Sequence, residues 1–291
     1  MAKAETKTVA TVKDETQLPA HLQINRRDKV KVGNTDTSDL ILPRVKLIQK
    51  ISPEVDDFDN AKPGEFWHTI VEESLGDNIR FTPILIRKTT MLWAPRGDDR
   101  GVLARSSDNI HWDAGFENLD FEIQPKGYPG KVKLSTKGSV GESGLLNFGT
   151  SVPGKANSAP AASLTYNILM YFHDFPDLSP AVTINTRSAV KSGKLLQSKI
   201  DIRPVNHYGQ VFRMFKTDET GDEGPYYGYG YSSDGYVENE ELYKDLEAMY
   251  NRFQSDNNWR VNEESDEGGS GGGSGGGASA KTEPGAAEGK F

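Results

Sequence analysis

The stretch from Asn78 to Asp113 constrains the fold most tightly. Residues 79–93 are rich in β-branched and aromatic side chains and are predicted to form a strand. Pro95 ends this strand because proline lacks the N–H group that a ladder requires. The Gly-Asp-Asp sequence at 97–99 favours a turn, and residues 101–105 then return as a second strand. The stretch therefore predicts a β-hairpin.

The hairpin carries an excess of cationic and aromatic side chains. They are Arg80, Arg87, Lys88, Trp93, Arg96, Arg100, Arg105 and Trp112. Cations that meet phosphates, interleaved with rings that stack on bases, are typical of surfaces that bind a single nucleic-acid strand. The alternative is a half-buried hairpin with solvated arginines and core tryptophans. The hairpin alone leaves both interpretations open.

Composition narrows the class of protein. The chain has 291 residues, no cysteine and a mean hydropathy of −0.62. No apolar run approaches the ~20 residues that cross a bilayer, and the N-terminus lacks the apolar segment of a secretory signal. Without cysteine there is no disulfide and no thiolate metal site. These features predict a soluble cytoplasmic protein with no membrane association.

The net charge of −8 is unevenly distributed. Residues 261–291 contribute −4 of it, which leaves −4 for the other 260 residues. An acidic total argues against nucleic-acid binding, but local patches decide binding. The Gly/Ser-rich tail cannot bury enough surface to fold. It is predicted to be an inert end, a tethered docking peptide or a mimic of nucleic acid.

Three regions are predicted along the chain. Residues 1–37 form a disordered polar and basic arm, residues 38–256 a single β-rich nucleic-acid-binding domain, and residues 257–291 a disordered acidic tail. An irregular Gly- and Lys-rich insertion lies near residues 113–163. Within the domain, strands are expected at 45–48, 66–71, 164–173, 181–185, 208–216 and 226–231, and helices at 186–200 and 237–253. Gly193 weakens the first helix by about 1 kcal/mol relative to alanine.

Catalytic patterns are absent from the sequence. The nearest phosphate-loop match, at 188–195, lacks its first glycine and final hydroxyl. The histidines are isolated, with no zinc-binding spacing. Asp56, Asp57 and Asp59 cluster in a loop and keep a metal-dependent nuclease open as an alternative. We therefore predict no catalytic residue, no cofactor and no bound metal.

Eight segments carry a family resemblance. They are LPRVKLIQKISPEV (42–55), KPGEF (62–66), LWAPR (92–96), LARSSDNIHWD (103–113), LTYNILMYF (164–172), INTRSAVKSGKLL (184–196), PVNHYGQVFRM (204–214) and ELYKDLEAMYNRF (241–253). In this order they resemble a family of tailed-bacteriophage single-stranded DNA-binding proteins from replication and recombination modules. Relatives of this type often carry a central cysteine cluster that would hold zinc. This chain has no cysteine, so the resemblance implies no zinc here.

The tail is similar to a second group. Bacterial and phage single-stranded DNA-binding proteins often place a Gly-rich linker and an acidic, Phe-ending tip after an OB-type barrel. Here the linker and Phe291 are present, but the acidic cluster precedes the linker. The similarity implies that Phe291 docks replication or recombination proteins.

Together, sequence and resemblance predict an α+β, mostly β fold: an OB-like or related small β-barrel with a C-terminal helix and disordered termini. The expected function is sequence-independent single-stranded DNA binding and protection in phage DNA replication or recombination, in the host cytoplasm, with an oligomer possible. The predicted binding residues are Arg87, Lys88, Trp93, Arg96, Arg105, Trp112, Arg187, Lys191, Lys194, Tyr208, Phe212 and Arg213. The alternatives are a phage structural or accessory interaction protein without nucleic-acid binding, and a metal-dependent nuclease.

Overall fold

The computed structural model describes residues 42–94, 100–125, 128–152, 154–221 and 224–255. The predicted arm at 1–37 and tail at 257–291 lie outside these ranges, as do Arg96 and Phe291. The strands are β1 (Val45–Leu47), β2 (Phe66–His68), β3 (Glu73–Ser74), β4 (Asn78–Trp93), β5 (Val102–Ser106), β6 (Asp120–Ile123), β7 (Val132–Ser135), β8 (Ala162–Phe172), β9 (Ala181–Thr186), β10 (Gln210–Gly221) and β11 (Gly224–Tyr236). The helices are α1 (Glu54–Asp57), α2 (Val140–Ser143), α3 (Val190–Asp201) and α4 (Glu240–Ser255).

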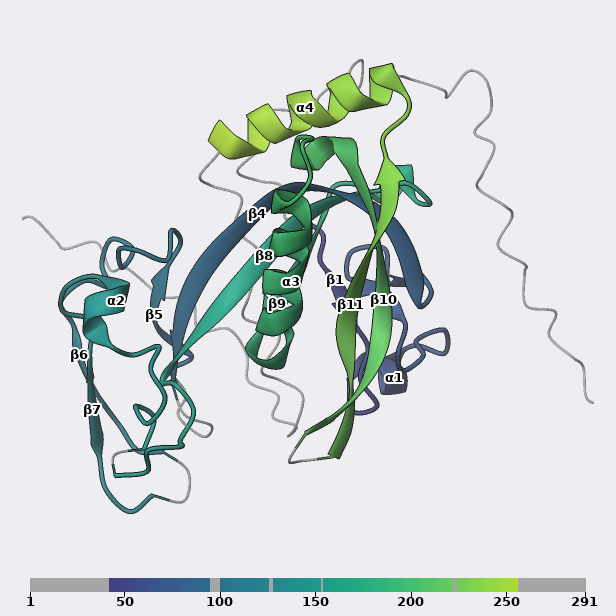
Figure 1. Cartoon of the computed structure of the whole chain (residues 1–291). Helices are drawn as coiled ribbons and strands as arrows, with labels where there is room; N and C mark the ends of the chain where they lie inside the picture. Colours follow the sequence, from purple (N-terminus) through teal and green to yellow (C-terminus); the bar gives the residue numbers. More distant parts are fainter. Residues whose placement is uncertain (1–41, 95–99, 126–127, 153, 222–223, 256–291) are drawn as a thin grey trace, which may run out of the picture. The chain divides into compact units, whose positions relative to one another are not determined.

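The main sheet has the order β11-β10-β4-β8-β9, and β5 pairs with the end of β4 (Figure 1). All of these pairings are antiparallel. The expected hairpin is confirmed, because Met91 pairs with Arg105 across β4 and β5. The register of β4 against β8 shifts between Pro83 and Leu85. Proline has no N–H for the ladder, so a bulge at this point is the expected place for it.

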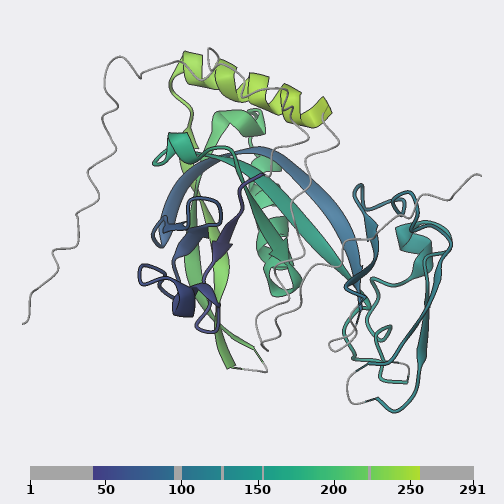
Figure 2. The ribbon, with the colours of Figure 1, turned by 180° about the vertical axis from the view of Figure 1, so that it is seen from behind.

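The sheet is open rather than closed into a barrel. Its edge strands β9 and β11 do not pair with each other in the described ranges. Instead β1 lies beside β9, where the Val182 amide donates to the Pro43 carbonyl at 2.8 Å, and the Leu47 amide donates to the Tyr229 hydroxyl of β11 at 3.1 Å. β2 pairs with β1, and Figure 2 shows these two purple strands beside the main sheet. The mostly β, α+β prediction is confirmed, whereas the predicted OB-like barrel is not.

Helices cover both faces of the main sheet. On one face, Leu196 and Ile200 of α3 pack in a cluster with Phe81, Ile168 and Phe212. On the other face, Leu246 of α4 packs in a cluster with Ile84, Leu169 and Tyr208. Burying each large apolar side chain contributes ~1.5–3 kcal/mol. Two such clusters explain why β8, covered on both sides, is a nearly continuous apolar segment.

The stretch predicted to be irregular contains its own small core. β6 pairs with β7, and α2 begins with a capping box in which Ser139 and Glu142 bond each other's backbone amides. Val132 and Val140 pack in a cluster with Trp112 and with Leu92 from the end of β4. This cluster fixes the segment to the end of the main sheet.

Gly193 has a packing role in α3. A Cβ at this position would lie 2.9 Å from Cγ of Tyr166 on β8. Because Cγ is only two bonds from the backbone of β8, it cannot move aside without a shift of the strand. Glycine therefore lets α3 approach β8 closely, and this offsets the lower helix propensity of glycine.

We expect Gly193→Ala to lower the free energy of unfolding by about 1–2 kcal/mol, because overpacking outweighs the gain in helix propensity. Urea denaturation measures the change. Gly141→Ala in α2 is the matched control, since a Cβ there meets no atom within 4 Å. The control should be neutral or slightly stabilising. A stabilised Gly193→Ala protein would contradict the packing role.

Candidate nucleic-acid interface

A groove of about 770 Å³ lies where β4 ends and β8 begins. Its walls include Trp93 from β4, Leu164 from β8, Val190 and Lys194 from the first turns of α3, and Phe148 from the loop after α2. Lys194 is the one charged side chain among the described residues that line the groove. The surface is therefore largely apolar, with a single cation at one wall.

Two aromatic rings line the groove, Trp93 at the end of β4 and Phe148 in the loop after α2. The ladder between β4 and β5 is irregular at Trp93, because Leu103 of β5 is an extra residue between the partners of Leu92 and Trp93. Trp93 is half-buried, and Phe148 is 75% exposed. Phe148 and the apolar lining of the groove form one continuous apolar patch, and such a patch marks a candidate contact surface.

Two further lysines lie close to this groove. Lys88 is exposed on β4, and its Nζ lies 6.0 Å from the ring centroid of Tyr166. The Tyr166 ring packs closely against α3 at Gly193. Lys191 is exposed on α3, one turn before Lys194. None of the three lysines forms an ion pair with another described residue. The structure thus brings together Lys88, Trp93, Lys191 and Lys194 of the predicted residues.

Three of the predicted stacking rings are buried, so the structure favours the core interpretation for them. Trp112 is 2% exposed and belongs to the small core around β6 and β7. Tyr208 donates a hydrogen bond to Glu247 at 2.9 Å beneath α4, and Phe212 packs against Phe81 in the main core. A base cannot reach these rings without displacing core side chains, so they do not belong to the interface.

The remaining predicted cations have other positions. Arg87 donates to the Phe253 carbonyl of α4 at 3.0 Å, and Arg105 pairs with Asp113 at 3.1 Å. Both are therefore already engaged with the protein. Arg96 lies outside the described residues, and for Arg187 the structure describes the backbone only.

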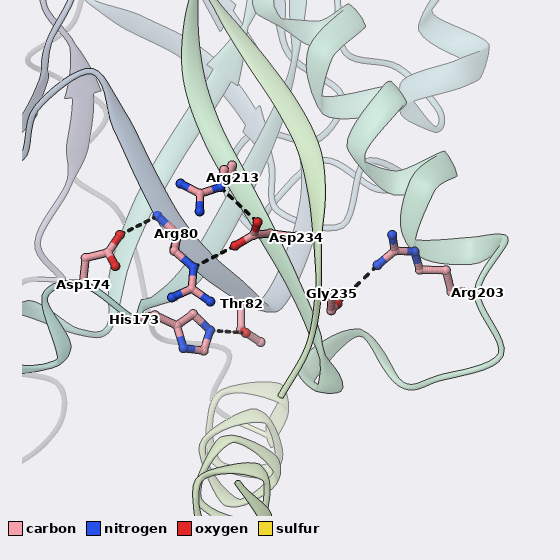
Figure 3. A network of polar contacts seen from close by, with 8 residues as sticks. All are labelled: Arg80, Thr82, His173, Asp174, Arg203, Arg213, Asp234 and Gly235. Carbon is pink, nitrogen blue, oxygen red and sulfur yellow. Dashed lines mark hydrogen bonds and ion pairs between the residues drawn. The ribbon is translucent and has the colours of Figure 1, made fainter. Parts of the chain in front are cut away.

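Arg213 belongs to a separate polar network (Figure 3). Asp234 of β11 accepts from Nε of Arg80 at 2.7 Å and from Nε of Arg213 at 3.0 Å. Burial raises the pKa of Asp234, but the hydrogen bonds from the two arginines outweigh it and hold the pKa below its usual range. Nearby, Nε2 of His173 lies 2.9 Å from the Thr82 hydroxyl, and burial, with Arg80, lowers the pKa of His173.

Three contributors were not identified from the sequence. Phe148 is a lone aromatic residue in a Gly-, Ser- and Ala-rich stretch. This isolation is the signal in the sequence by which it could be identified as a candidate contact residue. In the sequence, Arg80 is one of several hairpin arginines, with no feature that singles it out. Asp234 offers no local signal, because it is 154 residues from Arg80.

The described residues contain no group of three or more histidine, aspartate or glutamate side chains placed to hold a metal ion. Asp56 and Asp57 lie on the short helix α1, and Asp59 follows it. Among the described helices, none has the length and apolar character needed to span a membrane.

Comparison with known proteins identifies a phage protein family. The family model described as "Pam3 phage gp34-like protein" matches residues 12–258, and the chain belongs to this family. The match supports the phage origin that the resemblance implied. No curated protein and no solved structure matches the chain.

The Asp234 bridge predicts a loss of stability in acid. An unfolded aspartate has a pKa near ~3.9, and the folded value lies lower, so the bridge stabilises the fold above about pH 4. That stabilisation is lost as the pH falls through the folded pKa. Asp234→Asn should lower the free energy of unfolding by about 1 kcal/mol near neutral pH and flatten its decline below about pH 4.

Urea unfolding across this pH range measures both effects. Asp218→Asn is the control, because no described residue forms a hydrogen bond or ion pair with this exposed carboxylate. It should leave the stability profile unchanged. Equal acid profiles for the wild type and Asp234→Asn would contradict the assigned bridge.

Proposed function

We propose that this phage protein binds single-stranded DNA without sequence preference and protects it during replication or recombination. The observation that carries the proposal is the groove formed by Trp93, Phe148 and Lys194, with Lys88 and Lys191 beside it. Bases would stack on the two rings, and the lysines would neutralise phosphates. The proposal does not require the closed OB-like barrel that the resemblance implied.

The energetics favour the binding of a single DNA strand in this groove. Stacking a base on an aromatic ring contributes ~1–3 kcal/mol, so two accessible rings supply useful affinity. Among the described lining residues there is no carboxylate to repel a phosphate backbone. Three lysines at about −0.7 each predict a salt slope of about −2 in a logarithmic plot of affinity.

Titration of tryptophan fluorescence with oligo-dT at two salt concentrations tests the proposal. We expect binding at low salt that weakens with the predicted slope. Phe148→Ala should weaken binding by about 1–3 kcal/mol through loss of stacking. Lys194→Ala should weaken it and reduce the salt slope by about 0.7.

Ile51→Ala is the matched control for Phe148→Ala, because Ile51 is also 75% exposed but lies outside the groove. Lys244→Ala on α4 is the control for loss of charge. Neither should change the affinity. Absence of binding at low salt, or equal affinity in Phe148→Ala and the wild type, would overturn the proposal.

The apolar character of the groove favours a second candidate, in which it receives an apolar segment of another phage protein. The protein would then act as a structural or accessory component without binding nucleic acid. Such binding would change little with salt, and oligo-dT would not compete with it. Co-purification with virions through a Phe148-dependent contact would favour this alternative.

A further inference from the structure

Arg80 and Arg213 form an unusual pair on the surface. They are direct partners across β4 and β10, and each side chain is 41% exposed. Like charges directly opposite each other on a sheet are destabilising. Asp234 offsets this repulsion, because its two carboxylate oxygens each accept a hydrogen bond from one arginine. The bridge also holds both side chains in one orientation.

The bridge leaves most of the donor capacity of the two arginines unused. A guanidinium has five N–H groups, one on Nε and four on the two Nη atoms. Asp234 takes only the Nε group of each arginine. No other described residue accepts a hydrogen bond from the Nη groups of this pair. Figure 3 shows both guanidinium groups on the same side of Asp234.

The surrounding charges determine how such a site would select its ligand. The Asp174 carboxylate accepts from the Arg80 amide at 3.0 Å, so two carboxylates balance the two guanidinium groups. His173 has a lowered pKa, mainly through burial, and adds no charge at neutral pH. Long-range attraction is therefore weak. Selection would come from direct forked hydrogen bonds, and guanidinium geometry suits phosphate oxygens for this.

This pair lies on a different face of the sheet from the groove. Arg80 alternates with Phe81, which points into the core beneath α3. Leu164 lines the groove, and it shares its face of β8 with Ile168, which packs in the same core as Phe81. The pair is thus independent of the groove proposed for single-stranded DNA.

We propose that Arg80 and Arg213, braced by Asp234, form a binding site for a phosphate group. The prearranged guanidinium groups would each donate through their Nη edges to the phosphate oxygens. Because Asp234 already fixes the two side chains, little conformational entropy is lost on binding. The phosphate could be free, or it could belong to the backbone of a nucleic-acid strand.

Isothermal titration calorimetry with two probes, inorganic phosphate and oligo-dT, tests the site. We expect Arg213→Gln to weaken binding of at least one probe about tenfold or more, since hydrogen bonds to charged groups are strong. Arg213→Lys should also weaken it, because an ammonium group cannot form the fork. Lys244→Gln, which removes an exposed cation on α4, should have no effect.

The outcomes identify the source of the phosphate. Loss of inorganic phosphate binding indicates a free phosphate or phosphate monoester, and loss confined to oligo-dT indicates a backbone phosphate. Unchanged binding of both probes in Arg213→Gln, or no binding of either probe to the wild type, would overturn the site. In Arg213→Gln, Asp234 keeps its bond to Arg80, so the fold should survive, and circular dichroism checks this. Phe148→Ala should leave phosphate binding intact, which separates this site from the groove.

Discussion

The pairing of β4 with β8 is the interaction on which the rest of the structure depends. β4 runs for 16 residues and pairs with β10 at its start, with β8 along most of its length and with β5 at its end. Its register extends from Phe81 opposite Phe172 to Leu92 opposite Ala162. A slip of one residue would turn the core side chains of β4 outward. Both proposed sites depend on this register, since Arg80 lies near one end of β4 and Trp93 at the other.

The bulge after Pro83 reverses, in the second half of β4, which alternate side chains point to each face of the sheet. Phe81 and Ile86 contact the same core although they are an odd number of residues apart. Without the bulge, strict alternation would place them on opposite faces. Because of it, Lys88 shares a face with Ile86 and Tyr166 and lies beside α3, whereas Arg87 points to α4. One irregularity therefore decides which cations lie near the groove.

Local patterns in the sequence predicted most strands and both long helices, because alternation and helical spacing record which faces are buried. They could not predict which rings are exposed. Trp112 is buried because residues 113–163 form a small core of their own, and that core depends on contacts with the end of β4. Phe212 is buried by strand pairing with Phe81, far away in the sequence. The Asp234 bridge likewise joins three strands that only the fold brings together.

The central claim is that a single DNA strand occupies the groove beside α3. Photo-crosslinking of an oligonucleotide that carries bromodeoxyuridine, followed by mass spectrometry of the crosslinked peptides, tests it most directly. The account predicts crosslinks at Trp93 or Phe148, and their loss at high salt as the phosphate contacts weaken. Crosslinks confined to other surfaces, such as the exposed Ile51 or Tyr236, would contradict it.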